Sequence, residues 1–87
     1  MTAKVAIIGG GSTSFGPQMI GDAIRTPELK KSTIVLQDID TSRLRLIKKL
    51  ADIMVKESSS NVIIRQTTNL NEALEGADFV IVSYAID

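Results

Sequence analysis

Four short apolar runs alternate along this chain with segments in which apolar residues have a helical spacing. Three of the runs are nearly continuous and rich in Val and Ile: KVAII (Lys4–Ile8), TIVLQD (Thr33–Asp38) and FVIVSYA (Phe79–Ala85). Strands that are buried on both faces of a parallel sheet have this pattern. Two polar residues interrupt the fourth run, NVIIRQT (Asn61–Thr67), which predicts a strand at an edge of the sheet.

Three helices are predicted between these strands. The first places its apolar residues on one side and ends through Pro27; these residues are Phe15, Met19, Ile20, Ala23 and Ile24. The clearest helix runs from Thr41 to Glu57, with Asp40 as its candidate N-cap. Its predicted apolar face consists of Leu44, Ile47, Leu50, Ala51, Met54 and Val55, opposite the charged residues Arg45, Lys48, Lys49, Asp52 and Lys56. A short third helix, around Asn71–Glu75, is predicted to end at Gly76.

This alternation of strands and helices predicts an α/β fold with right-handed crossovers and helices on both faces of a parallel sheet. The expected strand order is 3-2-1-4, which is the first half of a doubly wound, Rossmann-like sheet. A complete fold of this kind continues beyond a fourth strand. We therefore expect residues 1–87 to be one nucleotide-binding segment, the N-terminal fragment of a longer enzyme.

A glycine-rich loop joins the first strand to the first helix. Gly9 and Gly11 have the spacing that permits a tight turn and a close approach of the backbone to a pyrophosphate. Hydroxyl donors follow directly at Ser12, Thr13 and Ser14. Ser14 stands where the third glycine of the GxGxxG pattern is expected, and glycines also form ordinary turns. The strand–loop–helix context favours a phosphate-binding loop over an ordinary turn.

An acidic residue at the end of the second strand completes the dinucleotide pattern. The carboxylate of Asp38 is predicted to hold the ribose hydroxyls of the adenosine and to repel a 2′-phosphate, which favours NAD over NADP. The alternative is that Asp38 and Asp40 serve only the turn and the helix cap, and for Asp40 we prefer that interpretation. For Arg43 two interpretations stay open: its side chain contacts a phosphate of the cofactor, or it lies on the solvated surface of the helix. Ser83, at the end of the fourth strand, is small enough to let the cofactor cross the sheet.

The composition narrows the possible chemistry. The net charge is zero and no basic run is present, which argues against a binder of nucleic acid or of a membrane surface. The chain has no Cys and no His, so it lacks a disulfide, a thiol nucleophile, a Cys/His metal site and a His general base. No run is long enough for a signal peptide or a membrane span, and a cytoplasmic location is the default expectation.

With these residues in hand, the chain resembles the NAD-dependent glycosidases of glycoside hydrolase family 4. The matching stretches cover essentially all of it: KVAIIGGGSTSF, MIGDAIRTPEL, VLQDIDTSRL and TTNLNEALEGADFVIVS. The resemblance assigns cofactor roles to Gly9, Gly11, Ser12, Thr13, Ser14 and Asp38. The final YAID departs from the VGG that is common in the family, so neither the sugar nor the subfamily follows from the match.

The resemblance implies an enzyme of carbohydrate metabolism that hydrolyses O-glycosidic bonds by oxidation and elimination. Such an enzyme uses bound NAD and a divalent metal such as manganese. Because it oxidises its substrate, its mechanism differs from that of glycosidases that use two carboxylates. The family's metal ligands and base are not matched within this chain, which is therefore expected to be inactive alone; a homo-oligomer is expected. Two alternatives stay open: a piece of an NAD-dependent 2-hydroxy-acid dehydrogenase of the lactate or malate type, and a non-catalytic NAD(H)-sensing module.

Overall fold

The computed structural model describes residues 3–9, 16–26, 31–58 and 61–82. Its elements alternate along the chain as β1 (Lys4–Ile8), α1 (Gly16–Arg25), β2 (Thr33–Gln37), α2 (Thr41–Ser58), β3 (Ile63–Thr67), α3 (Leu70–Leu74) and β4 (Phe79–Val82). Within the described residues, no helix has the length and apolar character that crossing a membrane requires.

The four strands form one parallel sheet in the order β3-β2-β1-β4, as predicted. β1 is central, and Val5 is paired with Ile34 on one side and with Phe79 on the other. β3 and β4 are the two edges. β3 begins at Ile63, two residues later than the apolar run predicts, because Asn61 and Val62 precede the ladder.

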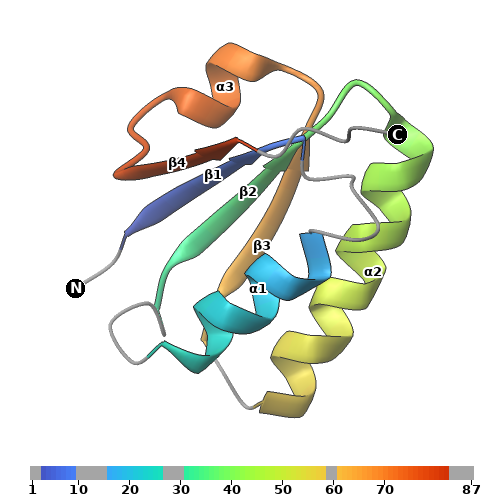
Figure 1. The fold of residues 1–87 in the computed structure, drawn as a ribbon, viewed down its shortest axis with the longest axis vertical. Coiled ribbons are helices and arrows are strands. Elements are labelled where there is room, and N and C mark those ends of the chain that lie inside the picture. The colour runs from blue at the N-terminus through green and yellow to red at the C-terminus, as the bar shows by residue number, and fades with distance from the viewer. Residues whose placement is uncertain (1–2, 10–15, 27–30, 59–60, 83–87) are drawn as a thin grey trace.

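The sheet lies between two layers of helix of unequal size. Figure 1 shows α1 and α2 together over one face, and the much shorter α3 over the other. The larger core lies between the sheet and the α1/α2 layer; its fully buried large side chains include Ile7, Ile20, Ile34, Leu36 and Ile47. On the α3 face the core consists of small residues, Ala6, Val35 and Ala73. Small side chains allow a short helix to lie close to the strands.

The predicted faces of the helices are confirmed in part. In α1, Ile20 and Ala23 are buried and Ile24 packs against them, whereas the side chains of Phe15 and Met19 lie outside the described part. In α2, the buried residues are Leu44, Ile47 and Ala51. The prediction for Leu50 was wrong, since 41% of its surface is exposed. The spacing of apolar residues overestimated the width of the face that the sheet and α1 cover. Gly76 ends α3 in the left-handed region (φ +70°), as predicted.

Candidate functional site

The turn after β1 is built around Gly9. Its φ of +81° lies in the left-handed region that favours glycine. Its N–H donates to the carbonyl of Gln37 across a distance of 2.7 Å. The start of the glycine-rich loop is therefore tied to the last residue of β2, at the carboxyl ends of two neighbouring strands.

The end of β2 is also tied to the end of β3. The side chain of Gln37 is buried, and its Nε2 donates to the carbonyl of Thr68 at 3.2 Å. The N–H of Asp38 donates to the carbonyl of Thr67 at 3.3 Å. A buried amide that is paired in this way resists displacement, because breaking the bond would leave a polar group unsatisfied. Hydrogen bonds thus join the carboxyl ends of β1, β2 and β3 to one another.

Asp38 and Asp40 do different things at this edge. Oδ1 of the half-buried Asp38 accepts a hydrogen bond from the N–H of Asp40 at 3.1 Å, which orients the Asp38 carboxylate. Oδ1 of Asp40 accepts from the N–H of Arg43 at 3.0 Å, and its carbonyl accepts from Leu44. These are the bonds of an N-cap, so the capping interpretation of Asp40 is confirmed.

Arg43 lies beside this cap on the first turn of α2. Its Nε is 3.5 Å from Oδ2 of Asp40, and about half of the Arg43 side chain is exposed. The structure therefore gives Arg43 a local acidic partner on the helix surface. A contact with a phosphate is not needed to explain its position.

Ile39, between the two aspartates, was not singled out from the sequence. It is 89% exposed, the highest value among the exposed large apolar side chains of the described part. The sequence signal that could have revealed it is an isoleucine in a polar turn between two acidic residues, where burial is not expected. It offers an apolar surface directly beside Asp38.

Two of the predicted cofactor residues, Gly9 and Asp38, thus belong to adjoining strand ends. The others lie outside the described residues; they are Gly11, Ser12, Thr13, Ser14 and Ser83. Their roles stay predictions, as does the ribose role of Asp38.

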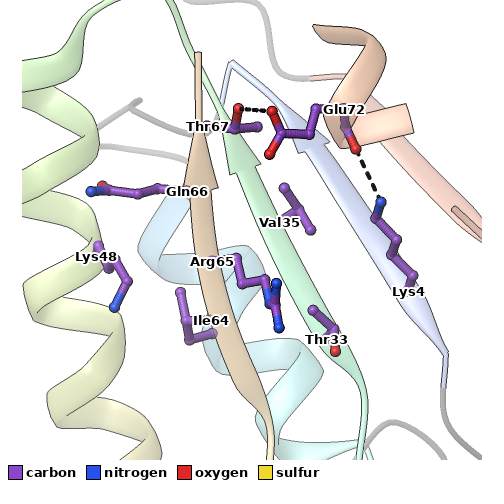
Figure 2. Close-up of a pocket in the computed structure, with 9 residues that line it drawn as sticks. All are labelled: Lys4, Thr33, Val35, Lys48, Ile64, Arg65, Gln66, Thr67 and Glu72. Atoms are coloured by element: carbon purple, nitrogen blue, oxygen red, sulfur yellow. Dashed lines mark hydrogen bonds between the residues drawn. The ribbon is translucent and has the colours of Figure 1, made fainter. Parts of the chain in front are cut away.

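A cavity of about 530 Å³ lies elsewhere, around β3 and on the α3 face of the sheet (Figure 2). Its polar side chains include Lys4 and Arg65. Nζ of Lys4 donates to the carbonyl of Glu72 at 3.1 Å and to that of Glu75, so this ammonium group serves the last turn of α3. The cavity therefore does not coincide with the carboxyl edge of β1 and β2, where the dinucleotide pattern lies.

In residues 3–9, 16–26, 31–58 and 61–82, no group of three or more His, Cys, Asp or Glu side chains is arranged to hold a metal ion. The described residues do not fit a manganese ion, and no step through a metal can be assigned to them.

Known proteins match this chain over nearly its whole length. The model of the family described as "Family 4 glycosyl hydrolase" matches residues 4–86. An alpha-glucosidase of Erwinia rhapontici is 34% identical over 86 residues, which is 99% of this chain and 19% of that protein. An alpha-galactosidase of Rhizobium meliloti is 35% identical over 78 residues, 90% of this chain and 16% of that protein.

Among solved structures, a 6-phospho-alpha-glucosidase from gut microorganisms, in complex with NAD and Mn²⁺, has the same fold as this chain. The TM-score is 0.84 at 28% identity, and the match covers 97% of this chain and 19% of the other. This chain thus spans less than a fifth of the length of these relatives.

Proposed function

The chain belongs to glycosyl hydrolase family 4, and from that premise we propose that it forms the NAD-binding segment of a glycosidase. The observation that carries the proposal is the joined carboxyl edge, where Gly9 has its positive φ and bonds to Gln37, directly before Asp38. In doubly wound sheets, dinucleotides bind outside the carboxyl ends of the strands. The similar glycosidase from gut microorganisms was solved with NAD bound.

Asp38 is the residue proposed to recognise the adenosine ribose. A carboxylate accepts hydrogen bonds from both ribose hydroxyls, and it repels the additional phosphate of NADP. The bond from the N–H of Asp40 fixes the orientation of this carboxylate before any ligand binds. Preorganisation of this kind lowers the entropy that binding would otherwise cost.

Ile39 is proposed to contact the adenine ring. Its exposed side chain follows Asp38 immediately, so a ribose held at Asp38 brings the base close to Ile39. A flat aromatic ring gains free energy by covering apolar surface. Ile39 would therefore add affinity without distinguishing NAD from NADP.

The proposed reaction of the whole enzyme is hydrolysis of an O-glycosidic bond by oxidation and elimination. NAD bound at this edge supplies a hydride acceptor for the sugar. The described residues of this chain bind and orient the dinucleotide. We assign to this segment the binding of the dinucleotide and not the cleavage of the glycosidic bond.

The test is a comparison of NAD and NADP binding by calorimetry for three proteins: wild type, Asp38→Asn and Asp40→Asn. Asp38→Asn should weaken NAD binding by about tenfold or more, because it removes charge-assisted hydrogen bonds worth about 1.5–3 kcal/mol. It should also narrow the preference for NAD over NADP, since the repulsion of the 2′-phosphate is lost.

Asp40→Asn is the matched control. Asparagine is an N-cap as good as aspartate, so α2 should remain intact and the cofactor preference should not change. An Asp38→Asn protein with the wild-type preference would contradict the ribose role.

A further inference from the structure

β3 is an edge strand with an unpaired outer side. Among the described strands it pairs only with β2. On that side the N–H of Ile63 donates to the carbonyl of Ser32 at 2.9 Å, and the carbonyl of Thr67 accepts from the residue that follows β2. In a parallel ladder, residues that bond to one neighbour alternate with residues whose N–H and C=O groups point to the other side. The backbone groups of Ile64 and Gln66 therefore point outward, away from β2.

The cavity around β3 follows this outer edge. Its volume is about 530 Å³, and four consecutive residues of the strand line it: Ile64, Arg65, Gln66 and Thr67. Figure 2 shows Gln66 directed toward α2, whereas Arg65 extends over the other face of the sheet toward Thr33. Because successive side chains of a strand point to opposite faces, a hollow on one face would be lined by alternate residues. This cavity therefore spans the edge itself and offers room for an extended chain beside β3.

Positive charge surrounds this edge of the sheet. Lys48 lines the cavity from α2, Lys4 and Arg65 line it on the other face, and Glu72 is the one carboxylate among the described lining residues. Lys48 is paired with Asp52, and Lys4 is bonded to carbonyls of α3. The exposed Arg65, by contrast, forms no ion pair with any residue that the structure describes. A strand that pairs with β3 gains most if it places an acidic side chain opposite Arg65.

We propose that β3 binds an extended acidic segment of a partner protein as an added strand. The backbone of the partner bonds to the outward N–H and C=O groups of Ile64 and Gln66, and a carboxylate of the partner pairs with Arg65. A charged residue on an edge strand disfavours pairing with apolar strands. Arg65 therefore both protects the edge and selects an acidic partner. The site does not include Gly9 or Asp38, so it does not depend on the binding of NAD.

Two-dimensional NMR during a titration with the blocked peptide Val-Thr-Glu-Thr-Val tests the proposal. Its β-branched residues favour an extended strand, and its glutamate lies at the centre. The amide signals of Ile64 and Gln66 should shift until the site is saturated. The same peptide methylated on every backbone nitrogen keeps the charge but cannot donate to β3, so it should cause no such shifts. Equal binding of the two peptides, which would indicate an anion site only, or no shifts with either peptide, overturns the proposal.

Gln66→Pro tests the pairing from the side of the protein. It removes an outward N–H, and proline is tolerated in an edge strand where the N–H faces solvent. The affinity for the peptide should fall by about tenfold, because a hydrogen bond is lost and the ring obstructs the added strand. Gln66→Ala is the matched control, since it keeps the N–H and should bind the peptide like the wild type. A folded Gln66→Pro chain with wild-type affinity would contradict strand addition.

A charge exchange tests the role of Arg65 without altering the backbone. Arg65→Glu should weaken binding of the glutamate peptide by about tenfold, and it should bind a peptide with a central lysine better than the wild type does. Lys49→Glu makes the same change of charge at an exposed position of α2 that does not line the cavity, and it should keep the wild-type preference. The NMR spectrum of each variant shows that it is folded. A folded Arg65→Glu chain that still prefers the glutamate peptide would rule out the selection of an acidic partner by Arg65.

Discussion

Asp38 and Asp40 are separated by one residue, yet their carboxylates accept hydrogen bonds from different backbone groups and have different roles. Asp40 accepts the N–H of Arg43 and caps α2, whereas Asp38 accepts the N–H of Asp40 and stands at the end of β2. The sequence predicted these two different roles, because Asp38 follows an apolar run whereas Asp40 precedes a segment with helical spacing of apolar residues. It did not predict the exposure of Ile39, because a spacing of apolar residues identifies buried positions and says nothing of an apolar side chain held in a turn.

Ile39→Ser should weaken NAD and NADP binding by the same factor. The loss of apolar contact with the adenine ring should cost about 1 kcal/mol, or about fivefold in affinity for each cofactor. Titrations of both cofactors against the variant measure this. A change in the ratio of the two affinities would show that Ile39 acts on the ribose end and not on the base.

At the scale of elements, the strand order, the edge position of β3 and the end of α3 at Gly76 were predictable from the sequence. These features follow from runs of Val and Ile and from a glycine that can adopt a positive φ. Leu50 was not predictable, because the width of the buried face of α2 depends on how much of it α1 and the sheet cover. The hydrogen bonds from Lys4 to the end of α3 could not be predicted either, because they join residues that are 68 positions or more apart along the chain.

Lys4→Met should lower the free energy of unfolding by about 1 kcal/mol. The variant loses hydrogen bonds from a charged donor to carbonyls at the end of α3, together with the favourable interaction of a cation with that helix end. Chemical denaturation measures the change. Lys48→Met is the control: Lys48 bonds to Asp52 on the surface of α2 at 2.9 Å, and removing such a pair should change the stability by no more than about 0.5 kcal/mol. Equal losses in the two variants would contradict a special role of Lys4.

At the scale of the whole molecule, the sheet and its two unequal helix layers form the Rossmann-like fold of a solved family 4 relative, and the joined carboxyl edge is where we propose that NAD binds. We expect the proposed oxidation and elimination to need residues beyond those that the structure describes. The sequence contains no Cys and no His, and the described residues include no metal cluster.

The purified chain should therefore show no glycosidase turnover when NAD and Mn²⁺ are supplied. Chromogenic α-glucosides, α-galactosides and their 6-phosphates are suitable substrates, and a family 4 enzyme of full length serves as the positive control. Metal-dependent hydrolysis by the 87-residue chain would mean that its own residues supply the catalytic groups.

The central claim is that NAD binds at the carboxyl edge of β1 and β2. Two-dimensional NMR of the chain during an NAD titration tests it most directly, because it locates even weak binding. The account predicts that amide signals shift at Gly9, Asp38 and Ile39, whereas those of Lys4 and Arg65, beside the cavity on the α3 face, do not. Shifts centred on Lys4 and Arg65, or no shifts at saturating NAD, would contradict it.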